Sequence, residues 1–437
     1  MTDLIAKAVA RSANVAEVAI GRGMLAQTGV IYARHFTGPA CLFADDRAWA
    51  AAGPQTEAAL HAAGIATRRH ILRATPRPKP TTDLADTLGA ALMPGETPVA
   101  IGSGVMNDVV KYAAFQRGLP YLCIATAASM DGYTSAGAPL SERGFKKTIA
   151  CRPARVLIAD LDVICAAPRD MTGWGYGDLA GKVPAGGDWM IADALGIEPI
   201  DAVAWPMVQD GLAGWLAQPE RIAAADPAAI AGLFHGLTLV GLAMEAHGSS
   251  RPASGADHQI AHLWEMDDLH HQGQRVSHGA CVAVGCVAVL RMYDWLLASP
   301  RQFDPDRPGP TMAAKAAEIR AAFGAGDIAE RAIAETAAKH VEGPALRDRL
   351  RQLTAAWPTL ADRLGARLMP APQMARALAT AGAPSDPGQI GVRRDQLHAT
   401  ILKARFLRSR YTLLDLLDET GLLAQAAEAG LGQKVRP

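Results

Sequence analysis

The strongest constraint on the fold is a series of short apolar runs in the N-terminal part of the chain. The runs are bounded by helical or turn patterns and occupy residues 38–45, 98–101, 121–125 and 154–160. Helical patterns cover residues 54–63, with Pro54 at the first position, and residues 108–117. Apolar strands of this length that alternate with helices predict a parallel sheet with helices on both faces. We therefore predict an α/β domain over residues 1–168.

The pattern changes near Pro168. From residue 169 to residue 437 strand signals disappear, and alanine-rich segments with helical periodicity take over. Three segments rich in proline, glycine or charge interrupt the pattern along the chain and predict loops at residues 75–82, 300–310 and 382–391. A chain of 437 residues exceeds one usual core, so we expect a second, all-helical domain over residues 169–437.

Composition excludes several classes of partner. Lys+Arg and Asp+Glu both number 43, so no charge excess favours nucleic acid or an anionic membrane. The one basic cluster, residues 403–410, predicts the polar face of an amphipathic helix. The longest apolar runs, such as residues 280–290, are too short to span a bilayer. Six scattered cysteines and the absence of a signal-peptide core predict a reduced, cytoplasmic protein.

A glycine-rich turn follows the second buried run. Residues 102–108 read Gly-Ser-Gly-Val-Met-Asn-Asp and lie between a predicted strand and a predicted helix. Glycines at such a turn let a pyrophosphate approach the backbone, and the helix N-terminus favours negative charge. The alternative is a tight structural turn, because the full dinucleotide fingerprint is absent.

Polar residues gather after two other predicted strands. Ser129, Asp131 and Ser135 follow the strand at residues 121–125, where open α/β sheets bind ligands. Asp45 ends an earlier strand, so its carboxylate could accept the ribose hydroxyls of NAD and repel the 2′-phosphate of NADP. The alternative for Asp45 is a helix N-cap.

A histidine-rich segment suggests a metal site. Five of the 12 histidines lie between His258 and His278, and His258 and His262 are four residues apart, which places them on one helix face. Asp178 offers a carboxylate in a predicted glycine-rich turn that opens a helical pattern. Two imidazoles and one carboxylate can hold a divalent metal with an open position. The alternative is a surface or core histidine pair.

These motifs resemble those of the sn-glycerol-1-phosphate dehydrogenases, within the dehydroquinate synthase and iron-containing alcohol dehydrogenase superfamily. The resemblance rests on five segments in the same order and covers most of the chain. They are residues 102–108, 126–132, 177–182 with Asp188 and Trp189, 258–278 and 402–416. One residue departs from the pattern, because Asp257 stands before His258 where a glutamate is expected.

The resemblance implies a Rossmann-like dinucleotide-binding domain, NAD or NADP, and one divalent metal. Zinc is expected first, with nickel or iron as alternatives. The implied metal ligands are Asp178, His258 and His278. Asp131 and His262 are implied to face the substrate as catalytic residues, with Asp178 also at the substrate. The implied cofactor contacts are Gly104, Val105, Met106, Asn107, Asp108, Thr126, Ser129 and Ser135, with Asp45 at the ribose.

The implied reaction is reversible hydride transfer at C2 between dihydroxyacetone phosphate and sn-glycerol 1-phosphate. Lys146, Lys147 and Lys182 are candidates for the substrate phosphate, against the alternative of surface lysines. Two further functions stay open: a polyol dehydrogenase or dehydroquinate synthase-like enzyme on the same scaffold, and a non-catalytic protein that binds metal or nucleotide. The expected partners are a small phosphorylated substrate and a second copy of the chain, with neither nucleic acid nor membrane.

Overall fold

The computed structural model describes residues 2–142 and 145–432, apart from the side chains of residues 2 and 145–147. The chain forms two compact units. The first comprises Met1–Leu179, Val203–Ser250 and Thr380–Gly382, and the second comprises Ala180–Ala202, Arg251–Ala379 and Ala383–Pro437.

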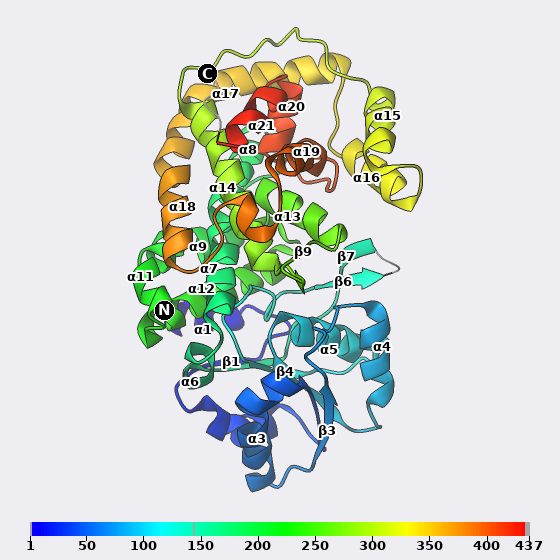
Figure 1. Ribbon diagram of the computed structural model, residues 1–437, viewed down its shortest axis with the longest axis vertical. Helices are drawn as coiled ribbons and strands as arrows, with labels where there is room; N and C mark the ends of the chain where they lie inside the picture. The colour runs from blue at the N-terminus through cyan, green and yellow to red at the C-terminus, as the bar shows by residue number, and fades with distance from the viewer. Residues whose placement is uncertain (1, 143–144, 433–437) are drawn as a thin grey trace. The chain divides into compact units, whose positions relative to one another are not determined.

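A six-stranded parallel sheet is the centre of the first unit, in the order β1-β8-β5-β4-β2-β3 (Figure 1). Its strands are β1 (Glu17–Gly21), β2 (Ala40–Asp45), β3 (Thr67–Leu72), β4 (Thr97–Gly102), β5 (Leu122–Ala125) and β8 (Val156–Asp160). The four inner strands are the four predicted apolar runs. Each has a neighbouring strand on both sides, and almost every residue of β2, β4, β5 and β8 is buried.

The two edge strands were missed by the sequence prediction. Both β1 and β3 are only partly buried, so neither needs an unbroken apolar run. β3 contains Arg68 and Arg69, which pair with Glu96 and Glu57. A strand with one neighbour and partial cover can carry charge, and this hides it from an analysis based on apolar runs.

The order of the strands creates a switch point between β2 and β4. From β2 the chain continues to β3 on one side, whereas from β4 it continues to β5 on the other side. Ala44 of β2 pairs with Ile101 of β4, which brings the ends of these strands together. In open α/β sheets this is where ligands bind. Asp45 and the 102–108 turn therefore lie at the same place on the sheet.

Helices and a separate hairpin complete the first unit. They are α1 (Thr2–Val9), η1 (Met24–Gln27), α2 (Thr28–His35), α3 (Asp46–Ala62), α4 (Thr82–Ala91), α5 (Gly104–Gln116), β6 (Ala138–Glu142), β7 (Phe145–Ile149), α6 (Leu161–Cys165), α7 (Arg169–Ala180), α9 (Ala204–Gln209), α10 (Leu212–Leu216), α11 (Pro219–Ala223) and α12 (Pro227–His247). The prediction that Pro54 begins a helix was wrong. Helix α3 begins at Asp46, eight residues before the predicted start, with Asp45 as its N-cap, and Pro54 lies inside the helix.

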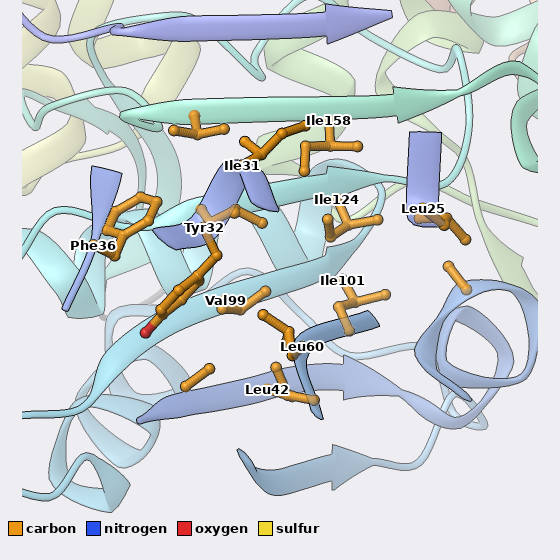
Figure 2. Packing of buried hydrophobic residues seen from close by; sticks show 14 of the residues in the cluster. Leu25, Ile31, Tyr32, Phe36, Leu42, Leu60, Val99, Ile101, Ile124 and Ile158 are labelled. Atoms are coloured by element: carbon orange, nitrogen blue, oxygen red, sulfur yellow. The ribbon is translucent and has the colours of Figure 1, made fainter. Parts of the chain in front are cut away.

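Aliphatic side chains from the inner strands form the core of this unit. Figure 2 shows Leu42, Val99, Ile101, Ile124 and Ile158 along the strands, packed against residues of α2 and α3. All five are fully buried. This packing makes the sheet a rigid base for the loops at its carboxyl ends.

Helix α12 packs with the first unit although the sequence division placed it with the helical domain. It is apolar on all sides, and the hydroxyl of Thr134 donates to the Thr238 carbonyl at 2.8 Å.

By length and apolarity both α12 and α14 could cross a membrane, so the statement that the apolar runs are too short was wrong. However, 67% and 83% of their most apolar windows are buried, as in core helices of a folded domain.

The second unit is built almost entirely from helices. They are α8 (Lys182–Ala194), η2 (Arg251–Ala253), α13 (Ala256–Met266), α14 (His278–Leu297), α15 (Met312–Phe323), α16 (Asp327–Ala337), α17 (Gly343–Arg367), α18 (Ala371–Thr380), η3 (Pro387–Ile390), α19 (Arg394–Ala404), α20 (Leu413–Glu419) and α21 (Leu423–Gly430). A two-residue antiparallel pair, β9 (His270–His271) and β10 (Gln274–Arg275), is the small departure from the all-helical prediction.

The basic run at residues 403–410 is not the polar face of a helix. Helix α19 ends at Ala404, and the arginines that follow lie in the connection to α20. Arg405 is only 5% exposed and pairs with Glu318 and Asp418. Buried ion pairs can place a charged run inside a fold, which periodicity alone does not reveal.

Candidate functional site

The turn between β4 and α5 presents backbone amides at the switch point. Ser103 is the N-cap of α5, with no hydrogen bond from its side chain to the helix. The helix begins at Gly104, so the amides of Gly104, Val105 and Met106 belong to its first turn. Amides in that turn have no carbonyl partner within the helix and can bind a phosphate.

The side chains of Asn107 and Asp108, at the end of the 102–108 turn, form hydrogen bonds within the protein. Asn107 is fully buried, and its amide donates to the Gly132 carbonyl at 3.2 Å and accepts from the Tyr121 hydroxyl at 3.0 Å. Asp108 is 7% exposed and accepts from Asn107 at 3.2 Å. The Asn107 side chain thus joins α5 to the loop after β5, whereas Asp108 contacts Asn107 and Lys111 of the same helix.

Lys111 organises the loop after β5 and was missed by the sequence analysis. It is fully buried, and its Nζ donates to the carbonyls of Gly132, Ser135 and Gly137 at 2.7–3.1 Å. The Ser135 hydroxyl also donates to the Gly132 carbonyl, at 3.1 Å. The only signal in the sequence is a lysine between apolar positions of α5, three residues after Asp108.

Thr126 and Ser129 lie where β5 ends. The Thr126 amide donates to the Gly102 carbonyl at 3.1 Å, which holds this loop against the glycine-rich turn. Thr126 is half-buried and Ser129 is 8% exposed. The structure therefore brings these two residues to the same edge of the sheet as the α5 turn.

Asp178 meets the loop that carries Asp131. It lies in α7, so its glycine-rich stretch is helical rather than a turn. Its Oδ2 accepts a hydrogen bond from the Asp131 amide at 3.0 Å, and the Asp178 side chain is fully buried. Gly175 makes this approach feasible, because a Cβ there would lie 1.8 Å from the Ala128 carbonyl oxygen.

Asp45 serves as a helix cap. Its Oδ1 accepts from the Ala48 amide at 2.8 Å, at the start of α3. Asp45 is partly exposed. The capping alternative is therefore realised, and it occupies one oxygen of the carboxylate.

The second unit brings the three predicted histidines together. His258 and His262 lie on α13, and His278 is the first residue of α14. Their ring centroids are 6.0 Å apart for His258 and His262, 5.3 Å for His258 and His278, and 5.7 Å for His262 and His278. Helix α13 and the connection through β9 and β10 to α14 thus bring three imidazoles together.

Two of these imidazoles are held by carboxylates. His258 Nδ1 lies 2.7 Å from Asp257 Oδ2, and His278 Nδ1 lies 3.0 Å from Glu265 Oε1. A carboxylate on Nδ1 favours the Nδ1–H tautomer and leaves Nε2 as the basic nitrogen, which is the usual arrangement of metal-binding histidines. The donor chemistry therefore fits a divalent metal.

His262, Glu265 and His278 form another group of side chains that could hold a metal ion. Ligand atoms of His262, Glu265 and His278 lie within 4.8 Å of one another. Glu265 already bonds His278 Nδ1, which suits an orienting role better than a ligand role. His262 is therefore the residue whose assignment most needs a test.

Lys182 is not a surface lysine. It is fully buried at the start of α8, and its Nζ lies 3.5 Å from His258 Nε2. Gly181 allows the beginning of α8 to approach α13 closely, because a Cβ at this position would lie 2.4 Å from Asp257 Oδ2. The side chains of Lys146 and Lys147 lie outside the described part of the chain.

Asp188 anchors the beginning of α13. Its Oδ2 accepts from the Ala256 amide at 2.7 Å, and its Oδ1 accepts from the Tyr293 hydroxyl at 2.6 Å and the Leu413 amide at 3.0 Å. Burial raises the pKa of Asp188 to about 6, against the opposing effect of these hydrogen bonds. This buried carboxyl group fixes the helix on which His258 and His262 lie.

Comparisons with known proteins show the family to which the chain belongs. A family model described as iron-containing alcohol dehydrogenase matches residues 19–168. Glycerol-1-phosphate dehydrogenase (NAD(P)+) of Bacillus velezensis is 33% identical over 325 residues, covering 74% of this chain and 70% of that protein. The chain belongs to the glycerol-1-phosphate dehydrogenase family. The relative from Bacillus subtilis is 42% identical over 197 residues, and this match spans 45% of the chain and only half of that relative.

Solved structures share the fold of this glycerol-1-phosphate dehydrogenase family member at low identity. Glycerol dehydrogenase from Schizosaccharomyces pombe has a TM-score of 0.61 at 15% identity, covering 96% of this chain and 91% of that one. An iron-containing alcohol dehydrogenase from Thermococcus thioreducens has a TM-score of 0.62 at 13% identity, covering 95% and 98%. The predicted fold, a Rossmann-like domain followed by a helical part, is confirmed.

Proposed function

We propose that this protein is a metal-dependent NAD(P)H oxidoreductase that interconverts dihydroxyacetone phosphate and sn-glycerol 1-phosphate by hydride transfer at C2. The observation that carries the proposal is the set of three converging imidazoles, two of them held at Nδ1 by carboxylates. Within a family of glycerol-1-phosphate dehydrogenases, this set suits a catalytic metal better than a structural core.

Asp178, His258 and His278 are the proposed ligands of one divalent metal, with zinc first and nickel or iron as alternatives. A bound divalent ion supplies Lewis acidity, which lowers the cost of negative charge on the substrate oxygen. Asp257 and Glu265 keep His258 and His278 oriented for this role.

The proposed cofactor site lies at the switch point of the sheet. Backbone amides from Gly104 to Met106 bind the pyrophosphate of NAD or NADP, and Asn107 and Asp108 contribute through their backbone. Thr126, Ser129 and Ser135 follow along the cofactor. Asp45 faces the ribose with the carboxylate oxygen that does not cap α3, so NAD is the preferred cofactor.

His262 and Asp131 are the proposed catalytic residues at the substrate. His262 lies beside the two metal-binding imidazoles, where it can move a proton to or from the substrate oxygen. Asp131 orients the substrate, and its amide holds Asp178. The protein is proposed to act as a cytoplasmic homodimer on a small phosphorylated substrate, without nucleic acid or membrane.

The direct test is NADH oxidation by the metal-loaded protein with dihydroxyacetone phosphate, followed by chiral analysis of the product. We expect sn-glycerol 1-phosphate. Turnover restricted to unphosphorylated polyols, or ring closure of a dehydroquinate synthase substrate, would replace the proposal with another enzyme of this scaffold. Tight binding of metal and NADH without any turnover would indicate a non-catalytic protein.

A further inference from the structure

One polar side chain of the histidine helix is buried without a hydrogen bond. Gln259 lies on α13, between the proposed metal ligand His258 and the proposed catalytic residue His262. It is only 1% exposed, and within residues 2–142 and 145–432 neither its Oε1 nor its Nε2 has a hydrogen-bond partner. A buried amide with both polar atoms unpaired is costly, so native folds rarely keep one without a reason.

The packing of α13 indicates the direction in which the Gln259 side chain leaves the helix. Trp264 Nε1 donates to the Thr400 hydroxyl of α19 at 3.0 Å, so that side of α13 faces α19. The Asp257 side chain lies against Gly181 at the beginning of α8. At about 100° of rotation per residue, Gln259 is turned roughly 140° from Trp264 and roughly 160° from Asp257. Its side chain therefore points away from both of these helix contacts.

Gln259 instead shares a face of α13 with His262. The two residues are three positions apart, which makes them neighbours on the helix surface, with Cβ atoms about 5–6 Å apart. The His262 ring lies 6.0 Å from the ring of His258, between centroids. The unpaired amide therefore lies on the side of α13 where the proposed function places the substrate. A ligand bound there would supply the hydrogen bonds that the protein does not.

The chemistry of the amide restricts the group that it can recognise. The carboxamide oxygen accepts hydrogen bonds and the nitrogen donates them, and both atoms of Gln259 are unpaired in the described structure. A carbonyl oxygen or a phosphate dianion only accepts, so either would leave Oε1 without a partner. An alcohol hydroxyl both donates and accepts. Dihydroxyacetone phosphate has one free hydroxyl, on a carbon directly bonded to the carbonyl carbon.

We propose that Gln259 is a specificity-determining residue that binds the free hydroxyl of the substrate. The inference rests on the proposed function, because it assigns a further contact of that same site. His262 is proposed to serve the oxygen at C2, and the hydroxyl lies on the adjacent carbon, so neighbouring side chains of α13 suit the two groups. A substrate without this hydroxyl would leave the buried amide unpaired, and the site should reject it.

The test compares dihydroxyacetone phosphate with hydroxyacetone phosphate, in which a methyl group replaces the hydroxymethyl group. For the metal-loaded wild type, kcat/KM should be at least about 100-fold lower with hydroxyacetone phosphate. Gln259→Met keeps the length of the side chain without the amide. It should lower kcat/KM for dihydroxyacetone phosphate by about tenfold to a hundredfold. It should not lower kcat/KM for hydroxyacetone phosphate, because that substrate has no hydroxyl to lose.

Unfolding in urea separates a ligand contact from a structural role. The amide is buried without partners in the protein, so Gln259→Met should keep or raise the urea midpoint of the ligand-free protein. A lower midpoint would show that the amide supports the fold and would overturn the inference. Gln352→Met is the matched control. Gln352 of α17 is exposed and donates to the Ala194 carbonyl at 3.2 Å, so its loss should change neither kcat/KM value.

Three further results would overturn the inference. The first is a Gln259→Met protein with normal metal content that keeps its kcat/KM for dihydroxyacetone phosphate, or loses equally with both substrates. The second is a wild type that uses hydroxyacetone phosphate as well as dihydroxyacetone phosphate, a measurement that needs no variant. The third is weaker binding of NADH to Gln259→Met in a fluorescence titration, which would assign the residue to the amide group of the nicotinamide. A wild type inactive on both substrates would overturn the proposed function itself, and this inference with it.

Discussion

The polar side chains around the α5 turn of the first unit and those of the histidine cluster of the second unit are used in different ways. In the first unit, the side chains of Asn107, Lys111 and Ser135 bond to backbone or neighbouring groups and shape the loops at the sheet edge. In the second unit, the Nδ1 atoms of His258 and His278 each form a hydrogen bond with a carboxylate. Their Nε2 atoms are the nitrogens that can bind a ligand. The region around the α5 turn thus presents backbone amides, whereas the histidine cluster presents side chains.

This difference predicts two responses to mutation. Loss of the side chain of Asn107, Lys111 or Ser135 should mainly lower the free energy of unfolding. Loss of a histidine in the second unit should remove metal or chemistry and leave the fold intact. The following experiments test that contrast.

The largest effect is expected from His278→Ala. Removal of a proposed ligand should cost more than the ~10–100-fold that changes in orienting partners cause, and should abolish nearly all turnover. Metal content of the purified protein, measured by elemental analysis, and NADH oxidation check this. A variant with one tightly bound metal and normal turnover would remove His278 from the ligand set.

His262→Ala should separate chemistry from metal binding. We expect full metal content and a fall in turnover of about 1,000-fold, because a positioned proton donor is lost. Elemental analysis and single-turnover kinetics measure the two effects. If the variant is instead purified without metal, His262 belongs to the ligand set with Glu265 and His278.

Lys111→Met should act on stability in the first unit. Three carbonyls would lose their buried donor and Asp108 would lose a neighbouring positive charge, so the free energy of unfolding should fall by about 3 kcal/mol. Urea unfolding measures this. Unchanged stability together with a large loss of NADH binding would show that Lys111 serves the ligand, which breaks the contrast.

Glu265→Gln should weaken metal binding by about tenfold, because a neutral amide orients His278 and supports its basicity less well than a carboxylate does. Titration of the metal-free protein with zinc measures the dissociation constant without reference to activity. Glu428→Gln is the matched control, since Glu428 faces His398 in a partly exposed pair of the same unit, away from the three histidines of the candidate site. Equal zinc affinity in wild type and Glu265→Gln would contradict the orienting role.

The smallest effect is expected at Asp45, where one carboxylate combines a cap with a proposed ribose contact. Asp45→Asn and Asp45→Ser both retain an N-cap acceptor, so stability should change little. The ratio of kcat/KM for NADPH over NADH should rise by about tenfold, since the repulsion of the 2′-phosphate disappears. A constant ratio in all three proteins would leave Asp45 as a cap alone.

The sequence by itself was enough to predict the inner sheet and the three histidines that the second unit brings together. Buried parallel strands must be apolar throughout, so β2, β4, β5 and β8 are visible as runs. The four-residue spacing of His258 and His262 defines one helix face, whatever surrounds the helix. These features are local, and local patterns can be read along a chain.

Only the tertiary structure decided which polar groups are occupied and which are available. The edge strands β1 and β3 carry charge because contacts elsewhere compensate it, and the same is true of buried Lys111 and Arg405. The partners of Asp257 and Glu265 come from packing or loop geometry that no periodicity encodes. Whether a charge is solvated, paired or waiting for a ligand depends on groups distant in sequence, because desolvation and hydrogen bonding are properties of the folded environment.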